Sequence, residues 1–577
     1  MSKINFWVKS SEIIDWIIKP QNPFRKKNNN FITWFPDAKL NIFENCISKH
    51  YKSDNKNKTA IFYVNKKKKI KSYSYTQLYY LVNNFAKILK KKINHNLNSK
   101  VIIHGSSSIE TTVSIFACVK LGIHFSVIFE DLAAEAIEKR VDLIKPNLFI
   151  TRFDKKNFKK NISSKVKKKW KFKSLFINDK ILNSSPTKNY VKDQILNSDR
   201  DLFTLFTSGS TGIPKGIVHS SGGYFFATKY SCLKQFGMNK NSVILTASNA
   251  GWINGHSYAL FGPLSIGAST VLVEDPFLLL DEKVLKKVLK LKITILYLPV
   301  TLIRLMKSFF GNKKFQTKYL KTLASMGEHL APPIAEWFAE SFTKKSKTVV
   351  NGYFQTENGS IIISPTFKDK ISKVPQGSVG KTITKKLRIN KLHKKNKIEI
   401  KLLSPWPGNM KRVLNGIKVW KKYWDKSGNF RMFDLATKKN GNLYIHGRTD
   451  DVINIRGHRI GCEEIESIIL KIIHVSECCA ISVPNFMEGE TLYLFVVSKK
   501  EKIDTTIEKQ IVNNFGSYAL PKKIFYLDEL PKTRSGKILR RLLRQALIDP
   551  DSLQKIDLNV MTNKSLINKV LYLIKNR

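Results

Sequence analysis

The sequence predicts an α/β protein with a large N-terminal domain of several subdomains and a small α+β domain after it. Between about residues 60 and 310, short apolar runs alternate with longer segments whose apolar residues recur at helical spacing. After about residue 450, strand and helix patterns mix over a length typical of one compact domain. Strands that alternate with helices are typical of parallel sheets, so the sheets of the large domain are expected to be mainly parallel.

The expected strands of the large domain are short apolar runs bounded by polar residues. They are Lys100–Ile103, Leu148–Thr151, Leu202–Phe206, Val243–Thr246, Thr270–Val273, Thr294–Pro299, Thr322–Met326 and Thr348–Phe354. The clearest helices are Tyr75–Lys92 and Ile109–Leu121, where the apolar residues share one helical face. The basic, poorly patterned segment Lys155–Lys180 is expected to be a surface excursion.

A domain boundary is predicted near Asp450, which gives an N-terminal domain over residues 1–449 and a C-terminal domain over residues 450–577. The elements expected after the boundary are a hairpin (Val452–Ile455 and His458–Ile460), a helix (Glu463–Ile473), three strands (Cys479–Val483, Thr491–Ser498 and Lys523–Leu527) and a basic helix from Ile538.

The formal net charge of +56 raises the alternative of a nucleic-acid-binding protein. Such a protein gathers its basic residues on one element beside base-reading or stacking groups. Here the lysine runs, such as Lys66–Lys69 and Lys167–Lys169, are scattered between ordinary elements. We therefore expect no specific nucleic-acid partner. Binding that falls steeply with salt and is not displaced by ATP would support the alternative.

The six cysteines include no C-x-x-C pair, and Cys478 and Cys479 are adjacent, which suits neither a zinc site nor an ordinary disulfide. This pattern indicates a reduced chain in the cytoplasm. No apolar run reaches the roughly 18 residues of a membrane span, so none is expected. The oligomeric state stays open.

The strongest local motif is the glycine-rich segment 207–216, Thr-Ser-Gly-Ser-Thr-Gly-Ile-Pro-Lys-Gly, which follows a predicted strand. Glycines let the backbone approach an anion closely, hydroxyls donate hydrogen bonds, and Lys215 adds a cation. The segment is not a Walker loop, because Ile213 and Pro214 separate Gly212 from the lysine. By its pattern alone it predicts a phosphate-binding loop or a flexible turn.

Three further motifs follow in order: Tyr353-Phe-Gln-Thr-Glu-Asn-Gly, a Gly447-Arg-Thr-Asp-Asp segment that continues to Gly461, and Leu530-Pro-Lys-Thr-Arg-Ser-Gly-Lys537. Together with the glycine-rich loop and Asp434, they resemble the signatures of the adenylate-forming (acyl-CoA synthetase) superfamily. The segments Trp34–Asn41 and Gly251–Tyr258 are similar to those of its short-chain branch, acetyl-CoA synthetases above all. The resemblance covers roughly residues 30 to 545.

The resemblance implies an adenylate-forming enzyme fold and a ligase with two half-reactions. A carboxylate attacks the α-phosphate of ATP to give acyl-AMP and pyrophosphate, and the thiol of CoA then displaces AMP. ATP and Mg²⁺ are the implied cofactors, CoA is a co-substrate, and a small carboxylic acid, acetate first, is the acyl donor. Positioning and preformed cations carry most of the first half, because two anions must meet.

The resemblance also implies the site residues. Lys537, Thr356 and Glu357 are the catalytic candidates, with Lys537 between the carboxylate and the α-phosphate and Glu357 holding Mg²⁺. The implied nucleotide-binding residues are Thr207, Ser208, Gly209, Ser210, Thr211, Gly212, Lys215, Gly327, Glu328, Asn351, Gln355, Asp434, Arg448 and Arg459. The implied acyl-pocket residues are Trp252, Ile253, Asn254, Met326 and Phe354.

In this superfamily the small domain turns about a hinge aspartate, here Asp450, to exchange the lysine loop for a CoA tunnel around Arg456 and Gly457. The C-terminal domain is therefore expected to be mobile. Arg456 stands where acetyl-CoA synthetases commonly have serine, and Met432-Phe433 precedes Asp434 in place of the usual Thr-Gly or Ser-Gly. The arginines that often bind the CoA 3′-phosphate are not evident.

Several alternatives stay open at this point. Phe354 replaces the usual tryptophan of the acetate pocket, and one or two more methylenes could fit beside the smaller ring, so propionate or another small acid is an alternative substrate. An adenylation domain that loads a carrier protein is a second alternative, which transfer to CoA without a partner chain would exclude. A member that has lost activity is a third, although Lys537, Glu357 and Asp434 argue against it.

Overall fold

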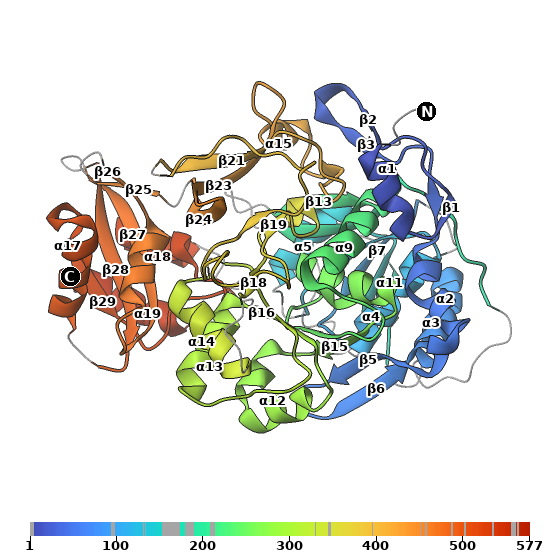
Figure 1. The fold of residues 1–577 in the computed structure, drawn as a ribbon, viewed down its shortest axis with the longest axis horizontal. Coiled ribbons are helices and arrows are strands. Elements are labelled where there is room, and N and C mark those ends of the chain that lie inside the picture. The colour runs from blue at the N-terminus through green and yellow to red at the C-terminus, as the bar shows by residue number, and fades with distance from the viewer. Residues whose placement is uncertain are drawn as a thin grey trace.

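Two seven-stranded sheets form the centre of the large domain (Figure 1). The computed structural model describes residues 5–93, 98–130, 132, 134–152, 173–178, 190–207, 214–328, 330–343, 348–394, 396–449, 452–455, 458–485, 489–500, 503–533, 536–555, 561, 563 and 565–576.

The first sheet carries the glycine-rich loop between two of its strands, β12 and β13. Its strands, in spatial order, are β10 (Lys173–Phe176), β9 (Leu148–Thr151), β7 (Lys100–His104), β8 (His124–Ile128), β12 (Asp201–Thr207), β13 (Lys215–Ser220) and β22 (Arg412–Val413). The strands from β10 to β12 are parallel, and β13 and β22 add antiparallel pairs at one side.

The second sheet ends beside the Tyr353–Glu357 motif. Its strands, in order, are β18 (Val350–Asn351), β17 (Thr322–Met326), β16 (Ile295–Pro299), β14 (Val243–Thr246), β15 (Ser269–Val273), β5 (Thr59–Val64) and β6 (Ile70–Ser74). All neighbours are parallel except β5 and β6. Every residue of β8, β15 and β17 is buried, as expected for parallel strands that are covered on both faces. The expectation of mainly parallel sheets is confirmed.

Helices cover both sheets, and their ends follow ordinary capping rules. Ser108 caps one helix by accepting from the backbone of Thr111, and Asp281 caps another by accepting from Lys283 and Val284. The helices of this domain are α1 (Phe6–Ser10), α2 (Lys49–Tyr51), α3 (Tyr75–Ile93), α4 (Ile109–Lys120), α5 (Ala134–Ile144), α9 (Ser221–Phe236), α10 (Ile253–His256), α11 (Gly262–Ile266), α12 (Glu282–Leu289), α13 (Val300–Phe310), α14 (Pro332–Phe342) and α15 (Ile417–Lys421).

Smaller sheets complete the large domain. A three-stranded antiparallel sheet, β21 (Ile398–Leu402), β23 (Phe430–Lys439) and β24 (Asn442–Arg448), leads toward the C-terminal domain. The remaining strands are β1 (Trp16–Ile18), β2 (Phe24–Lys26), β3 (Ile32–Trp34), β4 (Lys39–Leu40), β11 (Leu196–Asn197), β19 (Ile363–Ser364) and β20 (Lys381–Thr382).

The C-terminal domain has its own sheet and its own core clusters, and it lies at one end of the molecule beside α13 and α14 (Figure 1). Its strands are β25 (Val452–Ile455), β26 (His458–Gly461), β27 (Val475–Asn485), β28 (Gly489–Ser498) and β29 (Lys523–Tyr526). Its helices are α16 (Cys462–Ile469), α17 (Asp504–Phe515), α18 (Arg540–Ile548) and α19 (Ser565–Lys575).

Three sequence-based expectations need correction. The strand over Thr348–Phe354 is reduced to Val350–Asn351, because Tyr353 leaves the parallel sheet and pairs instead with Ile363 in an isolated antiparallel bridge. The helix over Glu463–Ile473 ends at Ile469, after which shorter i→i+3 hydrogen bonds close it. Within Lys155–Lys180, residues 173–176 form an edge strand in which only Leu175 is fully buried, so its apolar signal is weak. Residues 153–172 and 179–180 lie outside the described part.

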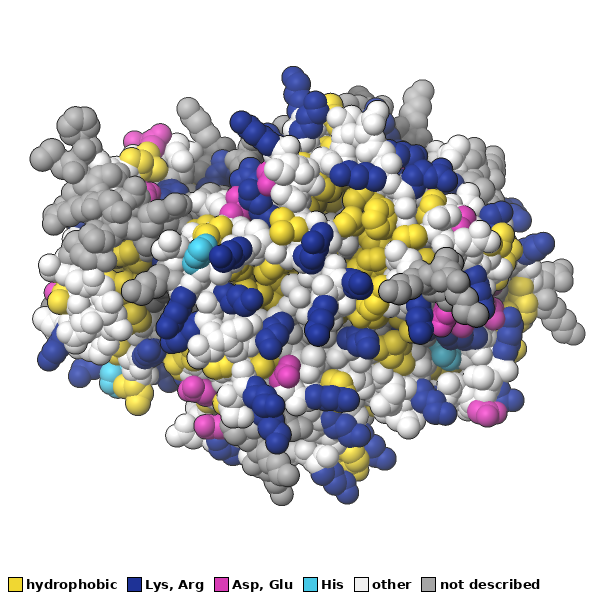
Figure 2. All heavy atoms as spheres, turned by 45° about the horizontal axis from the view of Figure 1, so that its top comes forward, with side chains coloured by type: hydrophobic (Ala, Val, Ile, Leu, Met, Phe, Trp, Pro, Cys, Tyr) yellow, Lys and Arg dark blue, Asp and Glu magenta, His cyan; other side chains and the backbone are white. Residues whose placement is uncertain are grey.

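In the described part of the chain, no helix combines the length and the apolar character that a membrane crossing requires. Figure 2 shows lysine and arginine side chains dispersed over one face, mixed with uncharged and hydrophobic ones. On this face the positive charge is therefore spread out.

Five buried histidines of the described chain give the fold a predicted sensitivity to acid. Burial lowers the pKa of His50, His104, His124 and His219 to about 4 and that of His256 to about 3. As the pH falls from about 6.5 toward 4, the unfolded chain binds a proton at each imidazole while the folded chain does not. The free energy of unfolding should then fall by up to about 1.4 kcal/mol per pH unit for each histidine.

Thermal unfolding between pH 7.5 and 5 measures this effect. His256 stacks against Phe125 with ring centroids 5.9 Å apart, so His256→Phe should keep the packing and reduce the slope of stability against pH by one proton. His474→Gln replaces an exposed histidine and serves as the control. An equal slope in wild type and His256→Phe would contradict the prediction.

Candidate active site

The segment 353–357 follows the edge strand β18 and lies between two buried carboxylate groups, those of Asp434 and of its own Glu357. Residues Thr356–Asn358 form a short 3₁₀ turn in which the side chains of Gln355 and Asn358 bond each other's backbone N–H groups. Burial keeps the imidazole of His219 neutral, and its Nε2 donates to the Thr356 carbonyl oxygen at 2.8 Å. These contacts hold the Thr-Glu turn in one orientation.

Asp434, on β23, is tied to one side of this segment. Its side chain is 7% exposed, and Oδ2 accepts from Tyr353 Oη at 2.7 Å and from Gln355 Nε2 at 2.5 Å. Gln355 Nε2 also donates to the Met432 carbonyl oxygen at 2.6 Å. Arg448 pairs with Asp434 in the register of β23 and β24, which puts both residues at one point of the sheet.

Phe433 adopts a left-handed backbone conformation with φ of +56°. This conformation costs a residue with a Cβ about 1–2 kcal/mol, whereas glycine adopts it freely. Glycine is the usual residue here in the superfamily that the motifs resemble. The ring lies 4.7 Å from the Arg431 guanidinium and packs edge-on to Tyr423 at 5.7 Å. These ring contacts help to offset the strain and support Tyr423.

Glu357 lies on the other side of the segment and reaches the base of the glycine-rich loop. Its side chain is 9% exposed, and Oε1 accepts from Tyr423 Oη at 2.8 Å. Lys215 Nζ lies 3.4 Å from the same Tyr423 oxygen. Thr207 and Lys215 pair across β12 and β13, so both ends of the glycine-rich loop start beside Glu357.

The residues present fit Mg²⁺. Among the described residues, no group of three or more histidine, cysteine, aspartate or glutamate side chains could cage a metal. Mg²⁺ is commonly bound by one or two carboxylates together with water and substrate phosphates. A single buried carboxylate such as Glu357 can supply the protein ligand of such a site.

The Gly327-Glu328 pair follows β17, and Gly327 has φ of +88°. Glu328 Oε2 lies 2.8 Å from Arg304 Nη2 and 2.9 Å from Thr301 Oγ1. Asn351 is buried on the neighbouring strand, where its Oδ1 accepts from Ser325 Oγ at 3.1 Å. These residues meet at the carboxyl ends of β17 and β18.

The acyl-pocket candidates are only partly brought together. Met326 and Phe354 belong to one apolar cluster with Tyr297, whose hydroxyl donates to Asn254 Oδ1 at 3.1 Å. Ile253 belongs to the main core of the large domain, against which Phe354 also packs. Trp252 packs on Phe129, at 5.1 Å between ring centroids.

The lysine loop docks on the large domain through the residue before Lys537. The Gly536 carbonyl oxygen lies 3.0 Å from Thr301 Oγ1, so the Thr301 proton is shared between this oxygen and Glu328. Gly536 has φ of +82°, and an added Cβ would lie 2.6 Å from Thr301 Cγ2. The Lys537 side chain is exposed, and its backbone N–H donates to Thr533 Oγ1 at 3.1 Å.

Some of the predicted site residues, or their side chains, lie outside the described part of the chain. They are Ser208, Gly209, Ser210, Thr211, Gly212, Asp450, Arg456 and Gly457, together with the side chains of Arg448 and Arg459, whose backbones lie in β24 and β26. Sequence reasoning missed Tyr423, Thr301 and Arg304. No motif marks them, because each becomes a neighbour of the site only when distant segments fold together.

Comparison with known proteins agrees with this arrangement. Residues 49–399 match the AMP-binding enzyme family. The chain belongs to this family. Residues 464–537 match the AMP-binding enzyme C-terminal domain, and residues 3–46 match the acetyl-coenzyme A synthetase N-terminus. This member of the AMP-binding enzyme family is an AMP-forming acid–CoA ligase, and ATP, Mg²⁺ and CoA are its cofactors and co-substrate.

Two relatives of this family member span nearly its whole length. It is 28% identical to the acetyl-coenzyme A synthetase of Helicobacter pylori (strain G27), over 99% of this chain and 93% of that protein. It is 30% identical to the acetyl-coenzyme A synthetase of Marinobacter nauticus, over 94% of this chain and 90% of that protein.

Solved structures share the fold. The acetoacetyl-CoA synthetase from Streptomyces lividans has a TM-score of 0.80 at 16% identity, covering 99% of this chain and 92% of its own. The anthranilate CoA ligase AuaEII, in complex with anthranoyl-AMP, has a TM-score of 0.75 at 20% identity, covering 88% of this chain and 97% of its own. The expected adenylate-forming fold is thus confirmed.

Proposed function

We propose that this AMP-binding enzyme joins acetate to CoA through an acetyl-adenylate. A carboxylate oxygen attacks the α-phosphorus of ATP, and the bond to pyrophosphate breaks. The CoA thiolate then attacks the acyl carbon, and AMP leaves with the bonding electrons. The relatives at 28% and 30% identity, both named acetyl-coenzyme A synthetase, support acetate.

One observation carries the assignment of the site: segment 353–357 touches Asp434 on one side and, through Glu357 and Tyr423, Lys215 on the other. The ribose hydroxyls of a nucleotide need a hydrogen-bond acceptor, and its phosphates need a cation a short distance away. We assign Asp434 to the ribose hydroxyls, with Arg448 beside it, and Lys215 with residues 207–212 to the phosphates. Thr356 donates to the α-phosphate, which Arg459 also contacts.

Gly327, Glu328, Asn351 and Gln355 are assigned to the nucleotide's adenine end. Glu357 would hold Mg²⁺, which supplies positive charge on the phosphate oxygens when bound. Lys537 offsets the repulsion between the acid and the α-phosphate, because its compact ammonium can serve both anions.

The boundary at residue 450 and the rotation about Asp450 are part of the proposal. In the orientation described here, Gly536 docks beside Glu328, which supports an arrangement suited to adenylation. Rotation would bring Arg456 and Gly457 to the site for the CoA half. We also propose a cytoplasmic location, which the six buried free thiols support.

Pyrophosphate release across unbranched acids of two to six carbons, with and without CoA, tests the function. We expect acetate to give the highest kcat/KM, and acyl-CoA to form without a partner chain. Highest activity with propionate would replace acetate by the larger acid. Product formation only on a carrier protein would contradict CoA ligation.

Phe354 is the residue expected to set the size of the acid. Its half-buried ring packs edge-on to Tyr258 at 5.8 Å and borders Met326 in the same cluster. Phe354→Trp should fill the space beyond a methyl group and raise the preference for acetate over propionate by about 10-fold, the scale for one methylene.

Steady-state kcat/KM for both acids measures the change. The control is Phe367→Trp, which enlarges an exposed phenylalanine. An unchanged acetate-to-propionate ratio in Phe354→Trp would remove Phe354 from the acyl pocket.

A further inference from the structure

A second basic site lies at the end of the first sheet opposite to the glycine-rich loop. A cavity of about 450 Å³ opens at the amino ends of β7, β8 and β12, where Lys100, His124 and Asp201 are the first residues of their strands. The glycine-rich loop follows Thr207 at the other end of β12, about 20 Å away at 3.3 Å per residue. The two sites are therefore distinct.

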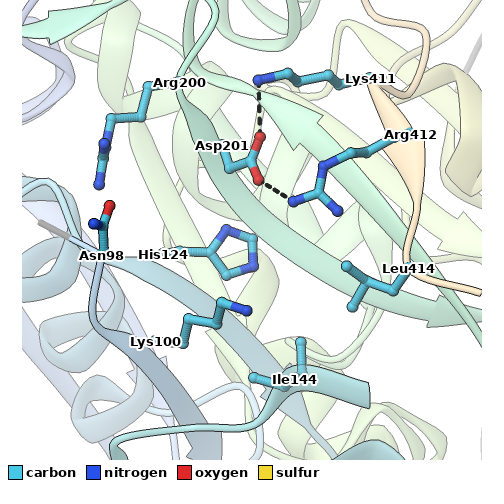
Figure 3. Close-up of a pocket in the computed structure, with 9 residues that line it drawn as sticks. All are labelled: Asn98, Lys100, His124, Ile144, Arg200, Asp201, Lys411, Arg412 and Leu414. Atoms are coloured by element: carbon cyan, nitrogen blue, oxygen red, sulfur yellow. Dashed lines mark hydrogen bonds and ion pairs between the residues drawn. The ribbon is translucent and has the colours of Figure 1, made fainter.

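The cavity is lined by four cations and one carboxylate. Figure 3 shows Lys411 and Arg412 approaching the two oxygens of Asp201 from one side, with Lys100 below them and Arg200 on the other side of Asp201. Lys411 Nζ lies 3.0 Å from Asp201 Oδ1, and Arg412 pairs with the other oxygen. Asp199 adds a longer contact to Lys411, at 3.5 Å. The two carboxylates therefore offset part of the charge of the four cations, and the cavity keeps a net positive charge.

Lys100 is the lining cation that no described carboxylate neutralises directly. In the described part of the chain, its ammonium has no ion pair with a carboxylate, while Lys411 and Arg412 both have one. Burial and the nearby Arg412 lower the pKa of Lys100, and Asp201 only partly opposes this shift, so its surroundings disfavour the charged form. His124 adds no charge at neutral pH, because burial lowers its pKa to about 4. An anion bound in the cavity would raise the pKa of Lys100 again and stabilise its charged form.

We propose that this cavity binds the diphosphate group of a small molecule. Near neutral pH a single phosphate carries at most two charges, whereas linked phosphates offer more oxygens to span Lys100 and the neighbouring Arg412 guanidinium. The volume is in the range of small-ligand pockets and leaves room for a diphosphate with a further group attached.

Lys100 is the residue to change, because it lies outside the proposed catalytic machinery. Lys411 and Arg412 are less suitable: they follow Met410, whose N–H donates to the Glu357 carbonyl oxygen at 2.7 Å. Lys173 is a matched control, since it is likewise the first residue of a parallel strand in the same sheet but is exposed and does not line the cavity.

Isothermal titration of the full chain with inorganic pyrophosphate, without Mg²⁺ and at fixed ionic strength, tests the proposal. Lys100→Gln should weaken binding at this site by at least about 10-fold, the scale for one charge-assisted contact, while Lys173→Gln stays within about two-fold of wild type. Pyrophosphate should raise the Tm of wild type and of Lys173→Gln, and much less that of Lys100→Gln. Without ligand, Lys100→Gln should melt no lower than wild type.

Three results would overturn the proposal: wild-type affinity in Lys100→Gln, an equal loss in Lys173→Gln, or orthophosphate binding as tightly as pyrophosphate. ADP then distinguishes a nucleotide from free diphosphate, scored only as the binding that Lys100→Gln removes and Lys173→Gln keeps, because ADP also binds at the active site. A Lys100-dependent affinity equal to or above that of pyrophosphate indicates a nucleotide, and a much weaker one indicates free diphosphate. Because these readouts need no turnover, they are independent of the acid that the enzyme ligates.

Discussion

Lys537→Ala should lower acyl-adenylate formation by about 10²–10³-fold or more, the scale for losing one preorganised donor to developing charge. The side chain makes no structural ion pair in the described part of the chain, so its loss should leave the fold intact. Thioester formation from supplied acyl-AMP should survive, since the two anions have already been joined. Pyrophosphate exchange measures the first half-reaction, and CoA-dependent consumption of acyl-AMP measures the second.

Lys523→Ala is the matched control, because Lys523 is an exposed lysine at the start of β29 in the same domain. It should leave both half-reactions unchanged. Equal loss of both half-reactions in Lys537→Ala would mean that the residue supports the domain rather than the adenylation step.

Gly536→Ala should lower adenylation by about 10²-fold, through displacement of the lysine loop by an order of 1 Å. The new Cβ would lie 2.6 Å from Thr301 Cγ2, and φ of +82° adds strain for any residue with a Cβ. The Gly536–Thr301 contact joins the two domains, so the defect should appear in pyrophosphate exchange. The CoA half should be affected less, because the proposed rotation separates these residues.

A second substitution makes this test specific. Thr301→Ser removes Cγ2 and keeps the hydroxyl that lies near Gly536 and Glu328, so the double variant should recover much of the lost adenylation. Gly441→Ala is the control for strain alone, since Gly441 has φ of +78° and its nearest neighbour would be 3.6 Å away. No recovery in the double variant would show that the observed docking is not the adenylation geometry.

The sequence predicts strongly patterned elements well. The strands Leu148–Thr151, Val243–Thr246 and Thr322–Met326 have the expected bounds, because each is a buried apolar run ended by polar residues. The edge strand Lys173–Phe176 was missed, since an edge position needs few buried side chains. Strand β13 was missed because the motif reading treated Lys215 as part of a loop.

The motifs alone identified the chemistry: an ATP-dependent acid–CoA ligase with Glu357, Asp434 and Lys537 as its charged candidates. These residues can be recognised from the sequence because each belongs to a contiguous motif. The partners Tyr423 and Thr301 and the basic cavity around Lys100 and Arg412 came only from the tertiary structure. Their members are far apart in the chain, and hydrogen bonds and ion pairs act over a few ångströms of space, whatever the separation along the sequence.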